Sequence, residues 1–443
     1  MNRFTITLPP LFALRALSWQ SALLGLCLVL GYLDLMLVLQ QPISVNAGQG
    51  WDGYYYYQMA AHADISGIYY AFRVRYGLPW LAGFFPTGDI LFNFKLINMV
   101  CALLYSACCY VILVRCSANM HPAVPLIGWC LVCAGNLAPI PSVLWYPIQT
   151  DVVTSLFALI FLMMMITGRI HLLAIAVLFF AGTAVRDNFP EFLLFGLMRL
   201  HLSYDRNKTL MENIRLLVEK NHASIAVIRS GLLASLAGIY SIAFFTGGIP
   251  FEDRLWDLKY ISGSYINNPV HLLAVITNSI SAILFIVFAS LWLPASVKYS
   301  GHLFGAPFTK LIIILLSLIA VLGGTNPERY WYWAMPFFVL CILPAINRLI
   351  ENKYYLLLGL CMLWTLFIQR TLVPIDRDGI AKDCDFSAIL SGHSNWIGHW
   401  ANLCSPLSQQ HLVTLASATG LVILLLAGLP QLRNTRLCKL FSP

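Results

Sequence analysis

Residues 92–114 read FNFKLINMVCALLYSACCYVILV, and this stretch decides the fold class. Lys95 is its only charged residue, and apolar side chains fill most of the other positions. The hydrocarbon core of a bilayer is about 30 Å thick, and an α-helix needs about 20 mostly apolar residues to cross it. The stretch therefore predicts a membrane-spanning helix.

The composition of the whole chain agrees with this interpretation. Of the 443 residues, 59% are apolar and only 10% are charged, whereas soluble domains have about 45–50% apolar and about 25% charged residues. These values exclude an ordinary soluble enzyme, a disordered chain and a fibrous repeat. The net charge of +8 does not indicate a nucleic-acid partner, because the basic residues lie in short loops and form no continuous patch laced with aromatic residues.

Apolar windows of this kind recur along the chain and predict about twelve transmembrane helices. The windows are 17–40, 92–114, 122–139, 149–168, 170–185, 188–203, 225–246, 271–295, 308–324, 331–347, 354–370 and 411–429. The fifth and sixth are short and flank the polar break Arg186-Asp187-Asn188, so two half-length helices and one re-entrant pair both stay open. The expected fold is an all-α polytopic membrane protein in which residues 1–443 form a single transmembrane domain.

The loop charges predict an orientation. Most lysines and arginines fall in the loops on one side of the predicted helices, and most acids fall on the other side. By the positive-inside rule the basic side is cytoplasmic, and an even number of spans then places both termini inside. We expect a multi-pass protein of a bacterial inner membrane, in contact with the lipid bilayer along its whole core.

Polar residues gather in three loops on the predicted outer side, at 41–91, 247–270 and 371–410. Connections as long as the first and third are usually functional, so we expect a site that faces outward. In the late outer loop, 371–410, Cys384 and Cys404 flank His393 and His399. A disulfide, free thiols and a zinc site all stay open there.

The first outer loop begins with the run Gly50-Trp51-Asp52-Gly53-Tyr54-Tyr55-Tyr56-Tyr57. A carboxylate at the membrane surface among aromatic rings is partly desolvated, which suits a general base. Asp52 is therefore a candidate catalytic residue, with a capping or loop aspartate as the alternative. Tyr55 is a candidate substrate-binding residue, and the alternative for these rings is the interfacial aromatic belt.

Two arginines follow in the same loop, within Phe72-Arg73-Val74-Arg75-Tyr76. Guanidinium groups match the geometry of phosphate oxygens, so Arg73 and Arg75 are candidate substrate-binding residues. Pairing with Asp52, Asp64 or Asp89 is the structural alternative.

Three more polar clusters lie at the predicted outer ends of helices. Asp151 opens the fourth window, either as a helix N-cap or as a site residue. Arg186 and Asp187 form the break noted above, and charged groups at membrane depth are usually functional. Glu328 and Arg329 precede the tenth window, where they pair with each other or Arg329 binds an anionic group.

These landmarks resemble the GT-C superfamily of membrane glycosyltransferases. The resemblance is carried by short motifs: the Trp-Asp-Gly-Tyr-Tyr run after the first span, residues 72–79, Pro147 with Asp151, Val185-Arg186-Asp187, and Pro327-Glu328-Arg329-Tyr330. It implies a GT-C-like fold and transfer of a sugar from a polyprenyl-phosphate donor. The acceptor would be a glycan, lipid or protein on the outer face.

The resemblance also implies roles for individual residues. Asp52 matches the first-loop acid, which serves as base or organises the acceptor, and Arg73, Arg75 and Arg329 match the arginines that hold the lipid phosphate. Asp151 and Asp187 are the other catalytic candidates. Tyr55, Arg186 and Glu328 are the other substrate-binding candidates.

The expected chemistry is inversion by a single displacement. The sequence has no nucleotide-binding or redox motif. This chain has Asp-Gly where many relatives have paired acids, so a requirement for Mg²⁺ or Mn²⁺ stays open. A lipid-linked oligosaccharide polymerase of the O-antigen type and a flippase or other transporter are the alternative functions.

Overall fold

The computed structural model describes residues 30, 46–49, 52–62, 67–68, 70–85, 87–133, 143, 146–168, 170–199, 209–246, 307–322, 327–355 and 358–359. Within these ranges every regular element is a helix, in agreement with the predicted all-α class. The predicted spans 17–40, 271–295, 354–370 and 411–429 lie mostly outside them. The total of twelve membrane spans therefore stays a prediction.

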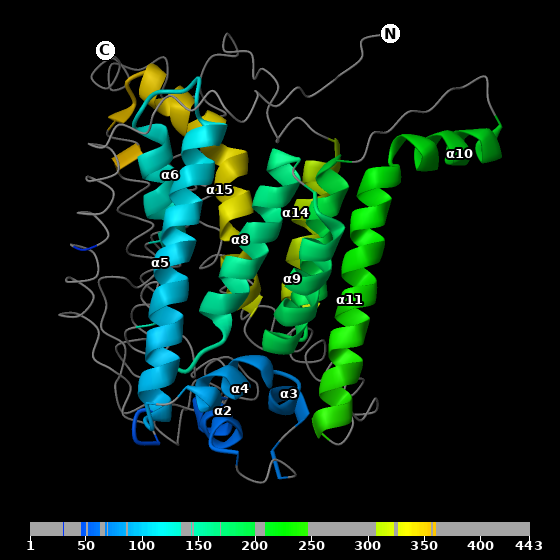
Figure 1. Cartoon of the computed structure of the whole chain (residues 1–443). Coiled ribbons are helices and arrows are strands. Elements are labelled where there is room, and N and C mark those ends of the chain that lie inside the picture. The colour runs from blue at the N-terminus through cyan, green and yellow to red at the C-terminus, as the bar shows by residue number, and fades with distance from the viewer. Residues whose placement is uncertain are drawn as a thin grey trace, which may run out of the picture.

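The helical segments that form the bundle run side by side along one common direction (Figure 1). They are α5 (Ile90–Cys116), α6 (Val124–Cys133), α8 (Asp151–Thr167), α9 (Leu172–Val185), η1 (Phe189–Arg199), α11 (His222–Thr246), α14 (Pro307–Leu322) and α15 (Pro327–Glu351). In this part of the chain, three helices are long and apolar enough to cross a membrane: Ile90–Cys116, His222–Thr246 and Trp333–Glu351. The described region is thus an apolar helical bundle of membrane type.

Local signals explain where these helices begin and end. The Asp89 carboxylate accepts the backbone N–H of Phe92 at 3.0 Å and caps α5. Pro307 and Pro327 are the first residues of α14 and α15, a position where the missing N–H of proline costs nothing. At the C-terminus of α8, Gly168 adopts the left-handed conformation with φ +72°, which glycine adopts without steric cost.

Two predicted segments differ from expectation. Within the window 188–203, residues Phe189–Arg199 form a 3₁₀ helix, η1, in place of an α-helix, and it follows α9 after the break at Arg186. Both α9 and η1 are shorter than a full crossing, which agrees with two short helices meeting at a polar break. The tenth helix, predicted at 331–347, begins at Pro327 and ends at Glu351.

The bundle has an interior helix and peripheral ones. In the apolar window of α15, 94% of the residues are buried, against 28% in α11. One exposed stripe of α11 carries Leu232, Leu236 and Phe244. On its other side, Gly231, Ser235 and Gly238 are small residues that let α11 approach α9 closely.

Three short helices close one end of the bundle, and we call them the α2–α4 cap (Figure 1). They are α2 (Asp52–Ala60), α3 (Tyr70–Arg73) and α4 (Gly77–Phe84). They form from the predicted first outer loop, 41–91. Their apolar side chains, including Tyr56, Met59 and Leu78, pack with Phe94 of α5 in a core separate from that of the bundle.

Basic side chains of the described residues gather at the other end of the bundle. Arg115 lies in the last turn of α5, Arg348 lies in the last turn of α15, and Lys353 follows α15. By the positive-inside rule this end would face the cytoplasm and the α2–α4 cap would face outward. The orientation remains a prediction.

Close packing inside the cap gives a first testable expectation. A Cβ atom added at Gly83 of α4 would collide with the backbone carbonyl oxygen of Ala60 in α2. Backbone atoms yield less than side chains do, so we expect Gly83→Ala to lower the free energy of unfolding by about 3 kcal/mol. Denaturant unfolding of the purified protein in detergent measures the change.

The matched control is Gly67→Ala, because no heavy atom lies within 4 Å of the added Cβ there. This control should shift the free energy of unfolding by less than about 0.5 kcal/mol. Equal stability of the two variants would show that α2 and α4 do not cross this closely.

Most of the described cysteines lie inside the bundle. Cys101, Cys108, Cys109, Cys130, Cys133 and Cys341 are free thiols that are buried or half-buried in the bundle, where they act as small apolar side chains. The prediction for Cys384 and Cys404, with His393 and His399, lies outside the described residues.

Candidate functional site

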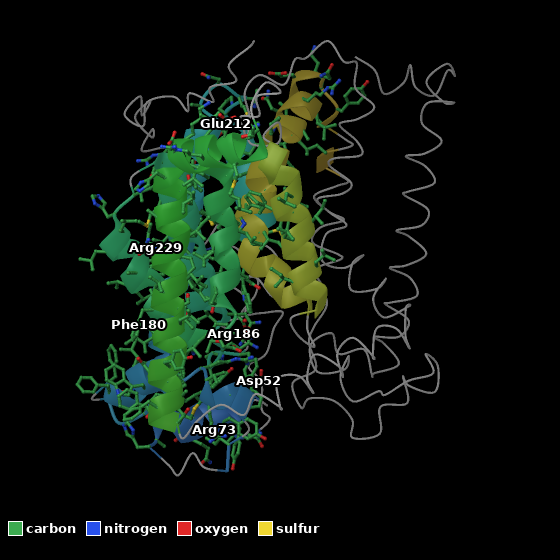
Figure 2. The ribbon with its side chains drawn as sticks, turned by 90° about the vertical axis from the view of Figure 1, so that its right-hand side faces the viewer. Asp52, Arg73, Phe180, Arg186, Glu212 and Arg229 are labelled. Atoms are coloured by element: carbon green, nitrogen blue, oxygen red, sulfur yellow. The ribbon has the colours of Figure 1, made fainter. Side chains whose placement is uncertain are left out.

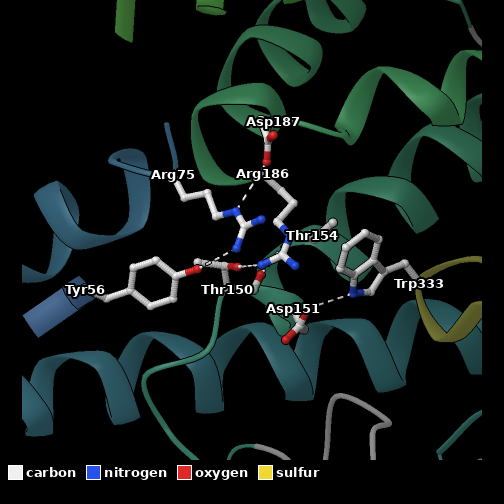
Figure 3. Close-up of polar contacts among 8 residues, drawn as sticks. All are labelled: Tyr56, Arg75, Thr150, Asp151, Thr154, Arg186, Asp187 and Trp333. Atoms are coloured by element: carbon white, nitrogen blue, oxygen red, sulfur yellow. Dashed lines mark hydrogen bonds and ion pairs between the residues drawn. The ribbon is translucent and has the colours of Figure 1, made fainter. Parts of the chain in front are cut away.

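Polar side chains from distant parts of the sequence meet where the α2–α4 cap joins the bundle (Figure 2). Figure 3 shows eight of them: Tyr56, Arg75, Thr150, Asp151, Thr154, Arg186, Asp187 and Trp333. They come from α2, the α3–α4 turn, the start of α8, the break between α9 and η1, and α15. We call this group the cap network.

Arg75 connects the cap to the break between α9 and η1. Its Nε lies 3.3 Å from Oδ1 of Asp187 in an ion pair, and its Nη1 donates to the hydroxyl of Tyr56 at 3.2 Å (Figure 3). The side chains of Arg75 and Asp187 are 13% and 7% exposed. Arg75 thus pairs with Asp187, an acid that the predicted alternative of Asp52, Asp64 or Asp89 did not include.

Electrostatics keep Arg75 charged. Burial alone lowers the pKa of the Arg75 guanidinium, but its interactions with Tyr56 and Asp187, with a smaller effect of Asp52, outweigh burial and hold its pKa above the ordinary value. Asp52 therefore lies within electrostatic range of Arg75. The network holds a permanently charged arginine in a desolvated setting.

Arg186 occupies the break itself. The helix α9 ends there because Arg186 has extended backbone angles, φ −149° and ψ 117°. Its Nη1 donates to the hydroxyl of Thr150 at 3.1 Å, and its guanidinium carbon lies 4.9 Å from the centre of the Trp333 ring. This arginine is only 3% exposed, so contacts with α8 and α15 position it firmly.

Asp151 is not an N-cap. The N-cap position of α8 is Thr150, which has helical backbone angles and makes no side-chain capping bond, and Asp151 is the first residue of the helix. Its Oδ1 accepts the indole N–H of Trp333 at 3.0 Å. Of the two predicted roles the capping one is therefore wrong, although the helix dipole still favours a carboxylate in this first turn.

Trp333 is a residue of the network that sequence reasoning missed. It lies in an aromatic run, Tyr330-Trp331-Tyr332-Trp333, and nothing in the sequence separates it from membrane-belt aromatics. In the structure it contacts Asp151 through its N–H and Arg186 through its ring face. It thereby joins α15 to both α8 and the break.

A substitution separates these two contacts. Trp333→Phe keeps an aromatic face beneath Arg186 but leaves the Asp151 carboxylate without its indole donor. We expect a loss of about 2 kcal/mol in unfolding free energy, the usual cost of removing a hydrogen bond to a charged group. Trp333→Leu removes the ring face as well and should cost about 1 kcal/mol more, as expected for a cation–π contact. Equal stability of wild type and Trp333→Phe in denaturant would contradict the role of the indole N–H.

Asp52 is the first residue of α2, and it is half-buried. The segment that leads into α8 fixes its position. The backbone N–H of Gly53 donates to the hydroxyl of Tyr146 at 2.9 Å, and an added Cβ at Gly53 would lie 2.9 Å from Ile148. The start of α2 is therefore held against the segment that carries Thr150 and Asp151.

Arg73 and Tyr55 belong to the cap, and their described contacts lie within it or to α11. Nη1 of Arg73 donates to the backbone carbonyl of Thr246 at 3.1 Å, which ties α3 to the last residue of α11. Nε of Arg73 is buried and has no hydrogen-bond partner among the described residues. Tyr55 stacks on Phe72 with ring centres 4.6 Å apart.

Glu191 is a second residue that our selection of site residues missed. It lies in the first turn of η1, within electrostatic range of Arg186 and Asp187. Its Oε2 atom is buried and accepts no hydrogen bond in the part of the chain that the structure describes. The polar run 186–191 in the sequence contains Glu191, but only Arg186 and Asp187 of this run were predicted to be site residues.

Other predicted site residues remain predictions. Glu328 and Arg329 lie in the first turn of α15, but their side chains lie outside the description, as does the late loop 371–410. Among the described residues, no three His, Cys, Asp or Glu side chains come together as a metal site would require.

Comparisons of the chain with protein-family models, with curated proteins and with solved structures found no match in any of the three.

Proposed function

We propose that this protein is a membrane glycosyltransferase of the GT-C type, which moves a sugar from a polyprenyl-phosphate donor to an acceptor glycan, lipid or protein on the outer face. One observation carries the proposal. Two arginines that the sequence predicted to bind substrate, Arg75 and Arg186, belong to one desolvated network at the end of an apolar bundle, with Asp52 in electrostatic range.

The arginines suit a lipid phosphate. In Figure 3 the guanidinium groups of Arg75 and Arg186 point toward the same region beside Thr150. A phosphate there would gain charge-assisted hydrogen bonds from both groups. Arg75 would exchange part of its contact with Asp187 for the donor. Arg73 would reach the donor only through the nitrogen atoms that do not bind Thr246.

Asp52 is the proposed base. It takes the proton of the acceptor hydroxyl while the acceptor oxygen forms a bond to the anomeric carbon of the sugar. The bond from that carbon to the phosphate oxygen breaks, and polyprenyl phosphate leaves with the electron pair. The arginines stabilise the charge that develops on the departing phosphate. A single displacement of this kind inverts the anomeric carbon.

The other two catalytic candidates receive narrower roles. Asp151 accepts from Trp333 and Asp187 pairs with Arg75, so in this proposal both are positioning residues. Asp151 holds the ring on which Arg186 lies, and Asp187 orients Arg75. Glu328 and Arg329 remain predicted substrate-binding residues at the start of α15.

The distribution of buried charge favours a transferase over a transporter. Among the described residues, the fully buried charged side chains are Asp151, Arg186 and Arg348. The first two belong to the cap network, and Arg348 lies in the last turn of α15. A transporter would be expected to line a path through the bundle with such groups.

An assay of the purified protein in nanodiscs tests the proposal. The protein is incubated with a panel of polyprenyl-phosphate and polyprenyl-diphosphate sugars, and the freed lipid phosphate is measured. Release with one donor supports the transferase and identifies its sugar. Movement of the lipid between leaflets without release would indicate a flippase instead. Growth of a lipid-linked chain by whole oligosaccharide units would indicate the polymerase.

A further inference from the structure

A second polar feature lies at the end of the bundle opposite the cap. The helix α10 (Leu210–Lys220) extends sideways from this end of the bundle, next to the start of α11 (Figure 1). Thr209 and Glu212 cap it reciprocally: Thr209 donates its backbone N–H to Oε2 of Glu212 at 2.8 Å, and Glu212 donates its own to Oγ1 of Thr209 at 3.3 Å. The helix is therefore well terminated although it projects from the bundle.

The sequence of α10 gives it two different faces. At 100° per residue, Met211 and Val218 fall on one side of the helix. The opposite side carries Glu212, Arg215 and Glu219, and Arg215 pairs with Glu219 at 3.0 Å. Met211 is 76% exposed and Val218 is 46% exposed. An amphipathic helix with exposed apolar side chains, projecting sideways from the end of a membrane bundle, matches a helix in the plane of the membrane interface.

Arg229 lies just beyond the corner between α10 and α11. It is exposed on the stripe of α11 that also exposes Ile225, Leu232 and Leu236. No hydrogen bond or ion pair joins it to another described residue. Figure 2 shows it on the half of α11 nearer to Glu212, far from Arg73 and Asp52. A guanidinium on an exposed apolar stripe, with no partner among the described residues, can take an anion from its surroundings.

The depth of Arg229 suits a lipid headgroup. At 1.5 Å per residue, about 10 Å of helix axis separates Arg229 from His222 at the start of α11. An arginine side chain extends several Å along the helix and places its charged end at the interface. That end would meet the phosphate groups of the leaflet in which α10 lies. Guanidinium groups bind phosphate oxygens through paired hydrogen bonds.

We propose that α10 lies in the membrane interface on the face away from the cap, and that Arg229 beneath it binds the phosphate headgroup of an anionic phospholipid. The apolar face of α10 covers the acyl chains next to this headgroup. The site is separate from the cap network and does not depend on whether the protein transfers sugars.

Native mass spectrometry of the whole protein tests the headgroup site. The protein is released from nanodiscs that contain equal amounts of phosphatidylglycerol and phosphatidylcholine, and the retained lipids are counted. We expect wild type to retain phosphatidylglycerol preferentially and Arg229→Leu to lose at least half of that preference. Arg229→Lys should keep most of it. The matched control is Arg215→Leu, which removes an arginine that already pairs with Glu219 and should leave the preference unchanged.

Unchanged retention in Arg229→Leu would overturn the headgroup assignment. So would an equal loss in Arg215→Leu, because the effect would then come from net charge alone. If Arg229→Leu does not fold, two other variants replace it. Arg229→Lys keeps the positive charge and Arg229→Gln removes it, so the phosphatidylglycerol preference of the two is compared. Preferential retention of added polyprenyl phosphate over phosphatidylglycerol at this arginine would also overturn the assignment to a phospholipid.

Photocrosslinking tests the placement of α10. A benzophenone amino acid replaces Met211 on the apolar face or, as the control, Glu212 on the polar face. Irradiation in nanodiscs should give several times more lipid adducts from position 211 than from position 212. Equal or fewer adducts from position 211 would show that the apolar face of α10 does not contact lipid.

Discussion

We expect the Asp52→Asn protein to lose transfer by a factor of about 10²–10⁴, the usual contribution of a positioned general base. Asparagine has nearly the shape of aspartate but cannot take up a proton from the acceptor hydroxyl. The neighbouring contact between the Gly53 N–H and the Tyr146 hydroxyl, at 2.9 Å, involves backbone that the substitution leaves in place. Stability should therefore change little. The measurement is donor turnover in nanodiscs, paired with thermal unfolding.

The chain offers a matched control in the same segment. Asp89 is another acid of the predicted first outer loop, but its carboxylate caps α5 through the N–H of Phe92. Asp89→Asn should cost at most about 1 kcal/mol of stability and leave turnover per folded molecule near the wild-type value. Comparable turnover losses in the two variants would remove Asp52 from the role of base. Near-normal turnover in Asp52→Asn would do the same.

The second large effect concerns the pair Arg75 and Asp187. Both side chains are largely buried, and Arg75 Nε lies 3.3 Å from Asp187 Oδ1. Asp187→Asn leaves a buried guanidinium without its counter-charge. Breaking a buried pair in this way destabilises a protein by about 3–5 kcal/mol. Because the two side chains retain some exposure, we expect the lower end, about 3 kcal/mol, in denaturant unfolding.

A double-mutant cycle separates the charge from the shape. Arg75→Met keeps an unbranched apolar side chain and removes the charge that Asp187 neutralises. The double variant, Arg75→Met with Asp187→Asn, should be more stable than the sum of the single effects predicts, with a coupling of at least about 1 kcal/mol. Strict additivity would mean that this ion pair does not hold the α2–α4 cap to the bundle.

The helices of the bundle were the most predictable part of this chain. The windows 92–114 and 225–246 became α5 and α11, with ends displaced by a few residues. Their signal was hydrophobicity over a length that only a membrane helix requires. The window 188–203 was less informative, because its composition does not distinguish a 3₁₀ helix from an α-helix. Whether the chain crosses the membrane twelve times stays a prediction.

The sequence indicated several residues of the candidate site, but it did not indicate which of them contact one another. Arg75 was singled out because guanidinium groups suit phosphate oxygens, and Asp151 because it opens an apolar window. Arg186 and Asp187 were singled out because charged groups at membrane depth are costly. Their partners depend on which segments meet in space. Arg75 and Asp187 are separated by more than one hundred positions, and Trp333 lies still further along the chain. No local spacing encodes such pairings.

The shortness of α9 and η1 has a consequence for the surrounding lipid. At about 1.5 Å per residue in an α-helix and about 2.0 Å in a 3₁₀ helix, the 14 residues of α9 and the 11 residues of η1 each extend only about 21–22 Å. A hydrocarbon layer of about 30 Å is thicker than either segment. The bilayer must therefore thin beside Arg186, or the bundle must screen this hydrophobic mismatch. Bilayers with shorter acyl chains would match α9 and η1 better, so the thickness of the membrane itself would tune the cap network.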